Sequence, residues 1–292
     1  MTDRSSEVVV GIDGSAASQR GLSVALREAA VLHDAVRVLH TWRTTPYVGA
    51  IPGFGYDVTP LEIEDLSAWG KQLVEDAIDQ AGPDAAAAQI VPDVRSGDAG
   101  TELVKASALA DLLVVGARRH GALASAVIGS ATNYVLHHAQ CPVLVVPAGT
   151  GPVRPWRRIV VGFDGSDCAD SALRWAAARA RAHRCPLVVV HAWQVYAGTM
   201  PGPDEYGAQA QAWLEERVRQ VLPDRTDIEA RAVQDYAATG LIAAAGPDDL
   251  LVVGSRGRNA LAHLMLGSVA LQCAHHAHSA VAVLRTGGGP TP

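Results

Sequence analysis

An acidic residue and a serine follow an apolar run at two places in this sequence. Val8-Val9-Val10 leads into Gly11-Ile12-Asp13-Gly14-Ser15, and the same order returns at Gly162 to Ser166. An aspartate at the carboxyl end of a strand can accept hydrogen bonds from a ligand, and adjacent glycines let a ligand approach the backbone. The same residues can also serve only to cap the following helix. Repetition favours ligand contact for Asp13 and Asp164, with Gly11, Ser15, Gly162 and Ser166 as secondary candidates.

A second set of residues suits an anionic ligand. An apolar run ends in Gly254-Ser255-Arg256-Gly257, and Gly267-Ser268 follows after nine further residues, at the predicted start of a helix. Glycines expose backbone N–H groups, and a helix N-terminus with a serine adds a hydroxyl and a dipole that favours phosphate oxygens. Turn formation and capping explain each residue singly, but they explain the spaced set poorly. The pattern predicts a phosphate-binding loop.

The first occurrence of this pattern differs at one position. Gly116-Ala117-Arg118-Arg119 precedes Gly129-Ser130, so Arg119 stands where the second occurrence has Gly257. A side chain there can crowd the phosphate path, or its guanidinium can pair with a phosphate. Arg118 and Arg256 occupy equivalent positions, where an arginine can clamp phosphates or lie solvated at the surface. We expect a ligand at both places, with altered affinity at the first.

These motifs belong to two copies of one unit. Residues 8–42 match residues 159–193 at 12 of 35 positions, with an offset of 151. Residues 111–147 match residues 249–285 at 17 of 37 positions, with an offset of 138. A stretch rich in proline and glycine separates the copies and is typical of a linker. We therefore predict one domain over residues 1–147, a linker over 148–155 and a second domain over 156–292.

Short apolar runs alternate with alanine-rich helical stretches within each copy, which is typical of βαβ units. The predicted fold class is α/β, with two tandem doubly wound, Rossmann-like domains. Each domain has a five-stranded, mainly parallel sheet with helices on both faces, and this layout binds ligands beyond the C-terminal strand ends. The predicted strands lie near residues 7–12, 35–41, 88–94, 111–116, 142–146, 158–163, 186–192, 228–234, 249–254 and 280–284. The predicted helices lie near residues 16–33, 61–81, 100–108, 130–139, 167–183, 205–221, 237–245 and 268–277.

Composition restricts the range of partners. The chain has 292 residues, 49% of them hydrophobic, which is enough for two ordinary cores. A net charge of −6 argues against nucleic acid or an anionic membrane as the main partner. The first residues lack the layout of a secretory signal, and the apolar runs are far shorter than the ~20 residues that cross a bilayer. We expect a cytoplasmic protein without membrane insertion.

Histidines and cysteines recur without a clear catalytic or metal-binding pattern. His40 and His191 follow the second strand of each copy, and a structural role is favoured over that of a general base because no repeated nucleophile accompanies them. Adjacent histidines near two predicted helix ends suit the helix dipole better than a metal site. The four dispersed cysteines indicate buried free thiols. We predict no catalytic residue and no metal ligand.

The second set of residues resembles the ATP-binding signature of the universal stress protein family, which has a strand, a Gly-x-x-Gly loop and a Gly-Ser pair nine residues later. The early aspartate resembles the adenine-side residue of that family, and the resemblance covers nearly the whole chain twice, as in an actinobacterial-like tandem member. It implies ATP as the ligand, with Mg²⁺, and at most slow hydrolysis. It implies nucleotide contacts by Asp13, Gly116, Gly129 and Ser130 in the first copy and by Asp164, Gly254, Gly257, Gly267 and Ser268 in the second.

Three functions remain open at this point. The family implies a nucleotide-dependent regulator of stress response or growth, read by an unidentified protein partner. The alternatives are an ATP-hydrolysing or phosphoryl- or nucleotidyl-transferring enzyme with a second substrate, and a nucleotide-free scaffold. The family also implies pairing through the last strand, here Val143 to Val146 with Val281 to Leu284. That pairing makes the chain an intrachain pseudo-dimer, and the whole chain is expected to form a homodimer.

Overall fold

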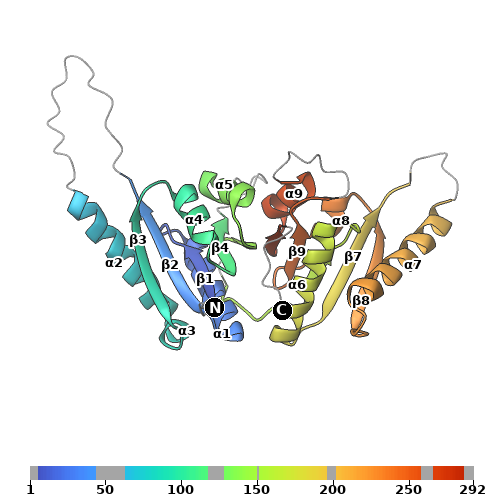
Figure 1. Cartoon of the computed structure of the whole chain (residues 1–292), viewed down its shortest axis with the longest axis horizontal. Coiled ribbons are helices and arrows are strands. Elements are labelled where there is room, and N and C mark those ends of the chain that lie inside the picture. The colour runs from blue at the N-terminus through green and yellow to red at the C-terminus, as the bar shows by residue number, and fades with distance from the viewer. Residues whose placement is uncertain are drawn as a thin grey trace, which may run out of the picture.

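A computed structural model describes residues 6–43, 63–117, 128–149, 151–195, 202–257 and 266–285 of the chain. Ten strands in this part of the chain form one continuous sheet (Figure 1). The strands are β1 (Glu7–Gly11), β2 (Ala35–Trp42), β3 (Ile90–Ser96), β4 (Leu112–Ala117), β5 (Val143–Pro147), β6 (Ile159–Gly162), β7 (Leu187–Trp193), β8 (Ile228–Gln234), β9 (Leu250–Gly254) and β10 (Ala280–Leu284).

The order of the strands across the sheet is β3-β2-β1-β4-β5-β10-β9-β6-β7-β8. Each copy contributes five strands that pair in parallel, with its first strand between its second and its fourth. The order in which successive strands are added reverses at these first strands, and in doubly wound sheets this is the place where ligands bind. The predicted fold class is confirmed. Each of the ten predicted strands begins and ends within two residues of an observed strand.

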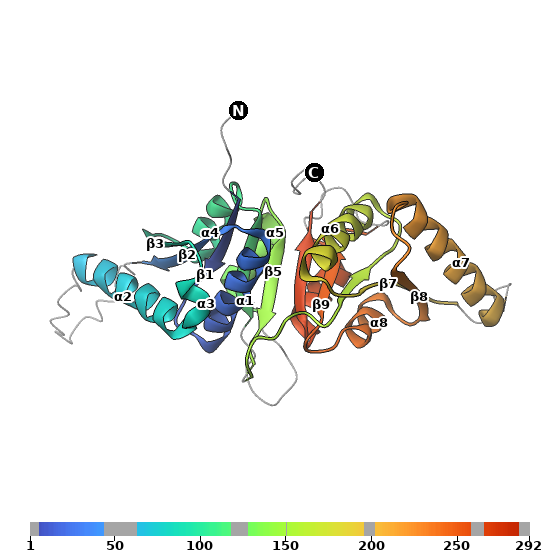
Figure 2. The same ribbon diagram turned by 90° about the horizontal axis from the view of Figure 1, so that it is seen from below.

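The two copies join through their last strands, as the family resemblance implied. β5 and β10 run antiparallel, and Leu144 lies opposite Ala282 in their register. These two residues occupy equivalent positions in the two copies, so a local two-fold axis passes between them. In Figure 2 the last strand of the first copy lies at the centre of the molecule beside the strands of the second copy. The pairing makes one ten-stranded sheet instead of two separate sheets.

Helices cover both faces of the sheet. The first face packs against the first and second helices of each copy, and the opposite face packs against the remaining long helices. Each of these layers forms a buried apolar cluster that runs through both copies. The first layer holds α1 (Ala16–Leu32), α2 (Ile63–Ala81), α3 (Pro83–Ala86), α6 (Asp167–His183) and α7 (Pro203–Val221). The second layer holds α4 (Ala99–Ser107), α5 (Ser130–His138), α8 (Ala237–Ala244) and α9 (Ser268–His276).

The first helix of each copy begins and ends in the same way. The hydroxyl oxygens of Ser15 and Ser166 accept hydrogen bonds from backbone N–H groups three residues later, which caps α1 and α6. Their C-terminal ends stop at His33 and Arg184, both in the left-handed region with φ of 62° and 54°. Capping is therefore the observed role of the two serine side chains.

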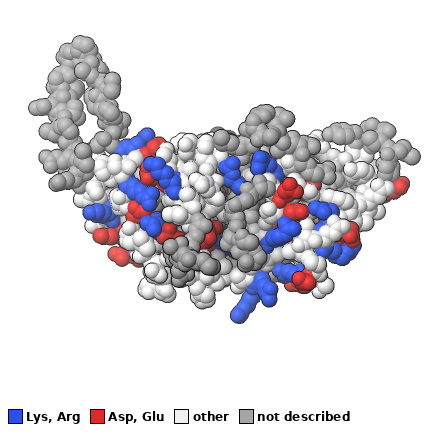
Figure 3. Space-filling model, viewed as in Figure 1, with Lys and Arg blue, Asp and Glu red and all other residues white. Residues whose placement is uncertain are grey.

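The surface carries charges of both signs. In Figure 3 basic and acidic side chains lie next to one another over both copies on the visible face. Such mixing fits the small net charge of −6, and the coloured residues of this face form no continuous basic stripe of the kind that tracks a nucleic acid. In the described part of the chain no helix is long and apolar enough to cross a membrane.

Candidate functional site

A cavity of about 510 Å³ lies in the second copy, where β6, β7 and β9 end. It occupies the crevice between the first and fourth strands of that copy, which is where a doubly wound sheet binds ligands. Seven of the residues singled out from the sequence line it, whereas Ser166 does not. The seven are Gly162, Asp164, Gly254, Arg256, Gly257, Gly267 and Ser268.

Asp164 connects the first strand of the second copy to the glycine loop. Its Oδ1 atom accepts the backbone N–H of Ser166 at 3.0 Å, which stabilises the turn into α6. A β carbon built on Gly257 would lie 2.7 Å from its Oδ2 atom. The side chain is half-buried and lines the cavity. The aspartate therefore supports a local turn and also lines the cavity, while its contact with a ligand stays a prediction.

The loop after β9 folds back onto the start of α9. The backbone N–H of Gly267 donates to the carbonyl oxygen of Ser255 at 2.6 Å, and the Ser166 hydroxyl lies 3.5 Å from the Arg256 carbonyl oxygen. Gly267 is the N-cap residue of α9, and among the described residues it provides no side-chain cap for the first turn. α1 and α6, by contrast, are capped by serines. The uncapped start of α9 leaves donors that suit an anion.

Four of the glycines have a packing role whatever ligand binds. A β carbon on Gly116 would lie 2.6 Å from the carbonyl carbon of Ala17, and one on Gly254 would lie 3.1 Å from that of Cys168. The first helix crosses the fourth strand closely at both places, so a β carbon would force α1 to move at Gly116 and would be tight against α6 at Gly254. A β carbon on Gly162 would lie 2.6 Å from the Leu241 side chain of α8, and one on Gly11 would lie 3.2 Å from the Leu103 side chain of α4, where the leucines can move more easily than backbone.

Sequence reasoning missed the apolar wall of the cavity. Phe163, Leu241 and other apolar residues form this wall, together with His191. Nδ1 of His191 lies 2.8 Å from the carbonyl oxygen of Phe163, and a carbonyl oxygen only accepts, so Nδ1 carries the proton. The His191 ring also lies 4.7 Å from that of Trp213, centroid to centroid. The recurrence of histidine near the end of the second strand was a signal for this wall.

The equivalent histidine of the first copy is held in the same way. Nδ1 of His40 lies 2.8 Å from the carbonyl oxygen of Ile12, and the side chain is buried. Both histidines thus fasten the second strand to the residue that precedes the early aspartate. Each of these two contacts is the kind expected of a structural histidine.

The first copy places its predicted residues at matching positions, but its loop is described only in part. Oδ1 of Asp13 accepts the backbone N–H of Ser15 at 3.0 Å, as in the second copy, although Asp13 is exposed. Gly129 precedes α5, whose first turn has no side-chain cap. Ser130 is the first residue of that helix. Arg118 and Arg119 lie outside the described residues.

The described residues contain no group of three or more histidine, cysteine, aspartate or glutamate side chains that could hold a metal ion. The adjacent histidines lie in the last turns of α5 and α9, as the sequence indicated. Cys141, Cys168 and Cys273 are buried free thiols, whereas Cys185 is half-buried. Burial raises the pKa of both Cys141 and Cys273 to about 12, so these thiols stay protonated.

Comparison with known proteins identifies the family. A model described as the universal stress protein family matches residues 5–147 and 155–285. The chain belongs to this family. A universal stress protein of Mycolicibacterium smegmatis is 31% identical over 292 residues, which cover 95% of this chain and 96% of that protein. A universal stress protein of Mycobacterium tuberculosis (strain H37Rv) is 30% identical over 303 residues, with 95% and 94% covered.

A solved structure supports the fold over the whole length. A universal stress protein from Archaeoglobus fulgidus superposes with a TM-score of 0.70 at 18% identity, covering 97% of this chain and 100% of that chain. The tandem arrangement is therefore shared with a solved member of the family. The resemblance drawn from the two glycine motifs is confirmed at the level of the family and the fold.

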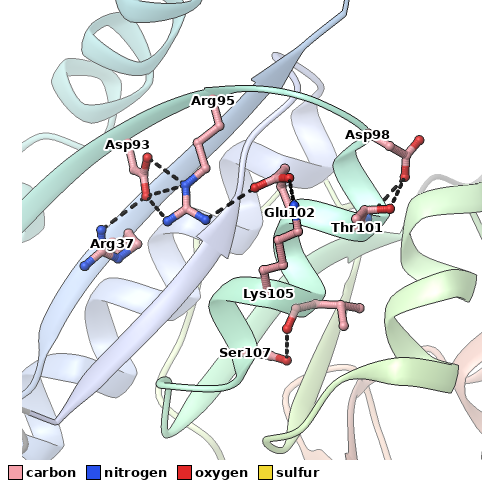
Figure 4. Close-up of polar contacts among 9 residues, drawn as sticks. Arg37, Asp93, Arg95, Asp98, Thr101, Glu102, Lys105 and Ser107 are labelled. Atoms are coloured by element: carbon pink, nitrogen blue, oxygen red, sulfur yellow. Dashed lines mark hydrogen bonds and ion pairs between the residues drawn. The ribbon is translucent and has the colours of Figure 1, made fainter.

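The two universal stress protein units differ in how they hold the helix beside the site. In the first copy, Arg95 of β3 pairs with Asp93 at 2.6 Å and with Glu102 of α4 at 3.5 Å, and Glu102 pairs with Lys105 at 2.7 Å (Figure 4). Asp93 also pairs with Arg37 of β2 at 3.1 Å. Although burial raises the pKa of the Asp93 carboxyl, Arg95 and Arg37 together lower it below its ordinary value.

The equivalent positions of the second copy carry no such ion-pair network. An offset of 138 places Arg231 at the position of Asp93, Val233 at that of Arg95 and Gly240 at that of Glu102. The helix involved, α8 in the second copy, carries Leu241 of the cavity wall. The sequence did not reveal this difference, because it depends on side chains of β2, β3 and α4 meeting on one face of the sheet.

Proposed function

We propose that this universal stress protein binds ATP in the cavity of the second copy and acts as a nucleotide-dependent regulator. The supporting observation is the lining of that cavity. Asp164 and an apolar wall line it together with the glycine loop and Ser268, the first residue of α9. This lining suits a ligand that combines a flat, largely apolar base with phosphates.

The base and the sugar would lie beside Asp164 and the apolar wall. A carboxylate can accept a hydrogen bond from a ribose hydroxyl or an exocyclic amine, and the Oδ1 atom of Asp164 also accepts from the backbone N–H of Ser166. Apolar residues around Phe163 and Leu241 would cover the faces of the base. A purine base fits this combination, since it is planar and carries polar atoms only at its edges.

The phosphates would lie beside Gly267 and Ser268, at the start of α9. Arg256, Gly267 and Ser268 line the cavity, and backbone N–H groups at a helix start, a serine hydroxyl and a guanidinium are all groups that bind phosphate. Mg²⁺ would arrive with the triphosphate and be held mainly by phosphate and water oxygens, as this ion prefers. Proposed contacts in the first copy are Asp13, Gly116, Gly129 and Ser130.

A regulatory role is favoured over catalysis by the set of side chains around the cavity. Among the described lining residues, Asp164 is the one carboxylate, and one of its oxygens supports the turn into α6. His191 uses Nδ1 to hold the Phe163 carbonyl oxygen. Rapid phosphoryl transfer needs groups that orient the nucleophile and stabilise the transferred phosphoryl group. We therefore propose slow hydrolysis at most, with a protein partner that reads the nucleotide-bound state.

The decisive experiment is to identify the ligand and its fate. Purified protein is denatured and the released small molecules are identified by mass spectrometry, and apo protein is then titrated with MgATP by calorimetry. We expect ATP at one to two molecules per chain, with ADP forming much more slowly than nucleotide exchanges. Protein that neither retains nor binds ATP would favour a scaffold, and rapid release of ADP would favour the enzyme.

A further inference from the structure

A buried charged cluster lies between the two copies, on the face of the sheet that carries α1 and α6. Glu28 of α1 is 0% exposed, and its Oε2 atom accepts from Arg179 of α6 at 2.9 Å. The Trp156 indole N–H donates to Oε1 at 2.7 Å. Nε2 of His183, also on α6, lies 3.0 Å from Oε1. The Glu28 carboxylate therefore has three partners, all from the segment after the first copy.

Glu28 and Arg179 occupy the same position in the two copies. The offset of 151 that aligns the early aspartates also aligns these two residues, each on the first helix of its copy. The local two-fold axis that passes between Leu144 and Ala282 relates the two helices, so a residue of one helix faces its own equivalent. An identical pair of copies would place identical side chains at this point.

We propose that Glu28 and Arg179 form a recognition element that makes the first copy pair with the second copy and reject a copy like itself. Two first copies would bury two carboxylates against each other, and two second copies would bury two guanidinium groups. A buried like-charge pair without compensation is strongly unfavourable, whereas the unlike pair is charge-compensated and hydrogen-bonded. The surface formed by α1 and β5 therefore selects the second copy as its partner.

The residues around the pair also favour pairing of the first copy with the second copy. His183 aligns with Leu32 and Trp156 aligns with Ser5, so the groups that complement Glu28 have no equivalents in the first copy. The Trp156 side chain is buried, and the guanidinium carbon of Arg27 lies 4.5 Å from the centroid of its ring. The chain thus enters the second copy through a residue that packs against α1. Any assembly of whole chains must then use a surface other than this one.

A charge-reversal cycle in the full-length chain tests the proposal. Glu28→Arg and Arg179→Glu each place two like charges at the contact, and we expect each to lower the thermal midpoint by about 10 °C or more. The double variant restores opposite charges, and we expect it to recover at least half of the summed loss. If the single variants do not fold, Glu28→Gln and Arg179→Gln give the same cycle with smaller steps. Additive losses, or single variants as stable as the natural chain, would overturn the proposal.

Reversal of an exposed ion pair provides the matched control. Glu216 pairs with Arg219 at 2.9 Å, and both side chains are more than half exposed. Glu216→Arg should shift the midpoint by no more than about 2 °C, because exposed pairs contribute little. A shift as large as that of Glu28→Arg would show that the cycle measures net charge and would overturn the proposal.

Selectivity itself is measured by refolding the two single variants together. The Glu28→Arg chain carries arginine at both positions, and the Arg179→Glu chain carries glutamate at both. The first copy of one chain therefore meets an opposite charge in a second copy only on the other chain. Among the dimers that form, we expect mixed dimers to exceed like dimers by about tenfold in native mass spectra. The two chains differ in mass, so the species are resolved. The statistical ratio of mixed to like dimers would overturn the proposal.

Discussion

The Asp164 carboxylate lies directly against Gly257. A β carbon on that glycine would approach Oδ2 to 2.7 Å, while Oδ1 accepts the Ser166 N–H at 3.0 Å. The carboxylate is thus fixed on one side and closely covered on the other. Any side chain at Gly257 must displace it, so this glycine determines the position of the aspartate at the cavity.

Replacing Gly257 with alanine should weaken ATP binding at least tenfold, equivalent to about 1.4 kcal/mol. The β carbon would push Asp164 away from its observed position, while the exposed loop leaves the core intact. Calorimetric titration measures the affinity. Gly202→Ala is the matched control, because nothing lies within 4 Å of a β carbon there and its φ is −63°. Equal affinity in both variants would contradict the proposed site.

Asp164→Asn and Asp13→Asn should have unequal effects on nucleotide binding. The amide keeps the oxygen that accepts from the residue two positions later, so the turn into the helix survives in both. We expect Asp164→Asn to remove the tighter binding event and Asp13→Asn to leave it, because the second copy has the complete glycine loop. Binding stoichiometry and affinity from calorimetry check this. A larger effect of Asp13→Asn would reverse the assignment of the main site.

Gly116→Ala should destabilise the fold, independently of any ligand. Its β carbon would meet the backbone of Ala17 at 2.6 Å, so α1 must move away from β4. We expect a loss of about 2 kcal/mol in the free energy of unfolding. Urea unfolding of nucleotide-free protein measures it. Gly129→Ala, where a β carbon meets nothing within 4 Å, should change the free energy by less than about 0.5 kcal/mol. Equal losses in the two variants would refute the packing role.

Acid should destabilise the contact between the copies. Burial raises the pKa of the Glu28 carboxyl, but His183, Arg179 and Trp156 together lower it below its ordinary value. A glutamate has a pKa of about 4.3 in the unfolded chain. Because the pKa of Glu28 is lower than this in the folded protein, its ionised carboxylate stabilises the fold above pH ~4.3. This stabilisation is lost as the pH falls through the pKa of the folded state. Unfolding free energy measured from pH 7 to pH 3 should therefore fall less steeply in Glu28→Gln. Parallel curves for the two proteins would contradict this.

The cysteines should react slowly with thiol reagents. Because burial raises the pKa of Cys141 and Cys273 to about 12, almost no thiolate forms at pH 8. We expect at most one of the four thiols to react within minutes in the native state, namely the half-buried Cys185, and all four to react in urea. Labelling followed by peptide mass mapping distinguishes them. Fast labelling of Cys273 in folded protein would show that the core opens there.

Much of the fold could be predicted because its strands are buried on both faces. Runs such as Leu250–Gly254 are almost uninterrupted by polar residues, so their limits are clear in the sequence. The duplication supplied the domain order and placed the site at strand ends. The short helix Pro83–Ala86 was missed, because four residues are too few to show a helical period.

Contacts between distant segments were beyond sequence reasoning. The sequence showed a glutamate and an arginine at equivalent positions, but nothing local indicates that Glu28 meets Arg179 across the two-fold axis. Likewise, the spacing of Gly254 and Gly257 gave both a ligand role. The structure distinguishes them. A β carbon on Gly254 would meet the backbone of α6, and one on Gly257 would meet the Asp164 carboxylate at the cavity. Such distinctions depend on which atoms approach in three dimensions.

Because β5 and β10 belong to one chain, their pairing does not depend on the concentration of the protein. Two separate chains that pair through such strands dissociate as their concentration falls, because their association is bimolecular. Here the halves share one chain, so pairing is intramolecular, with an effective concentration on the order of millimolar for a short linker. A cell with few copies of this protein therefore holds the same paired species as a cell with many. Any response of the pair then follows the level of the ligand and not the abundance of the protein.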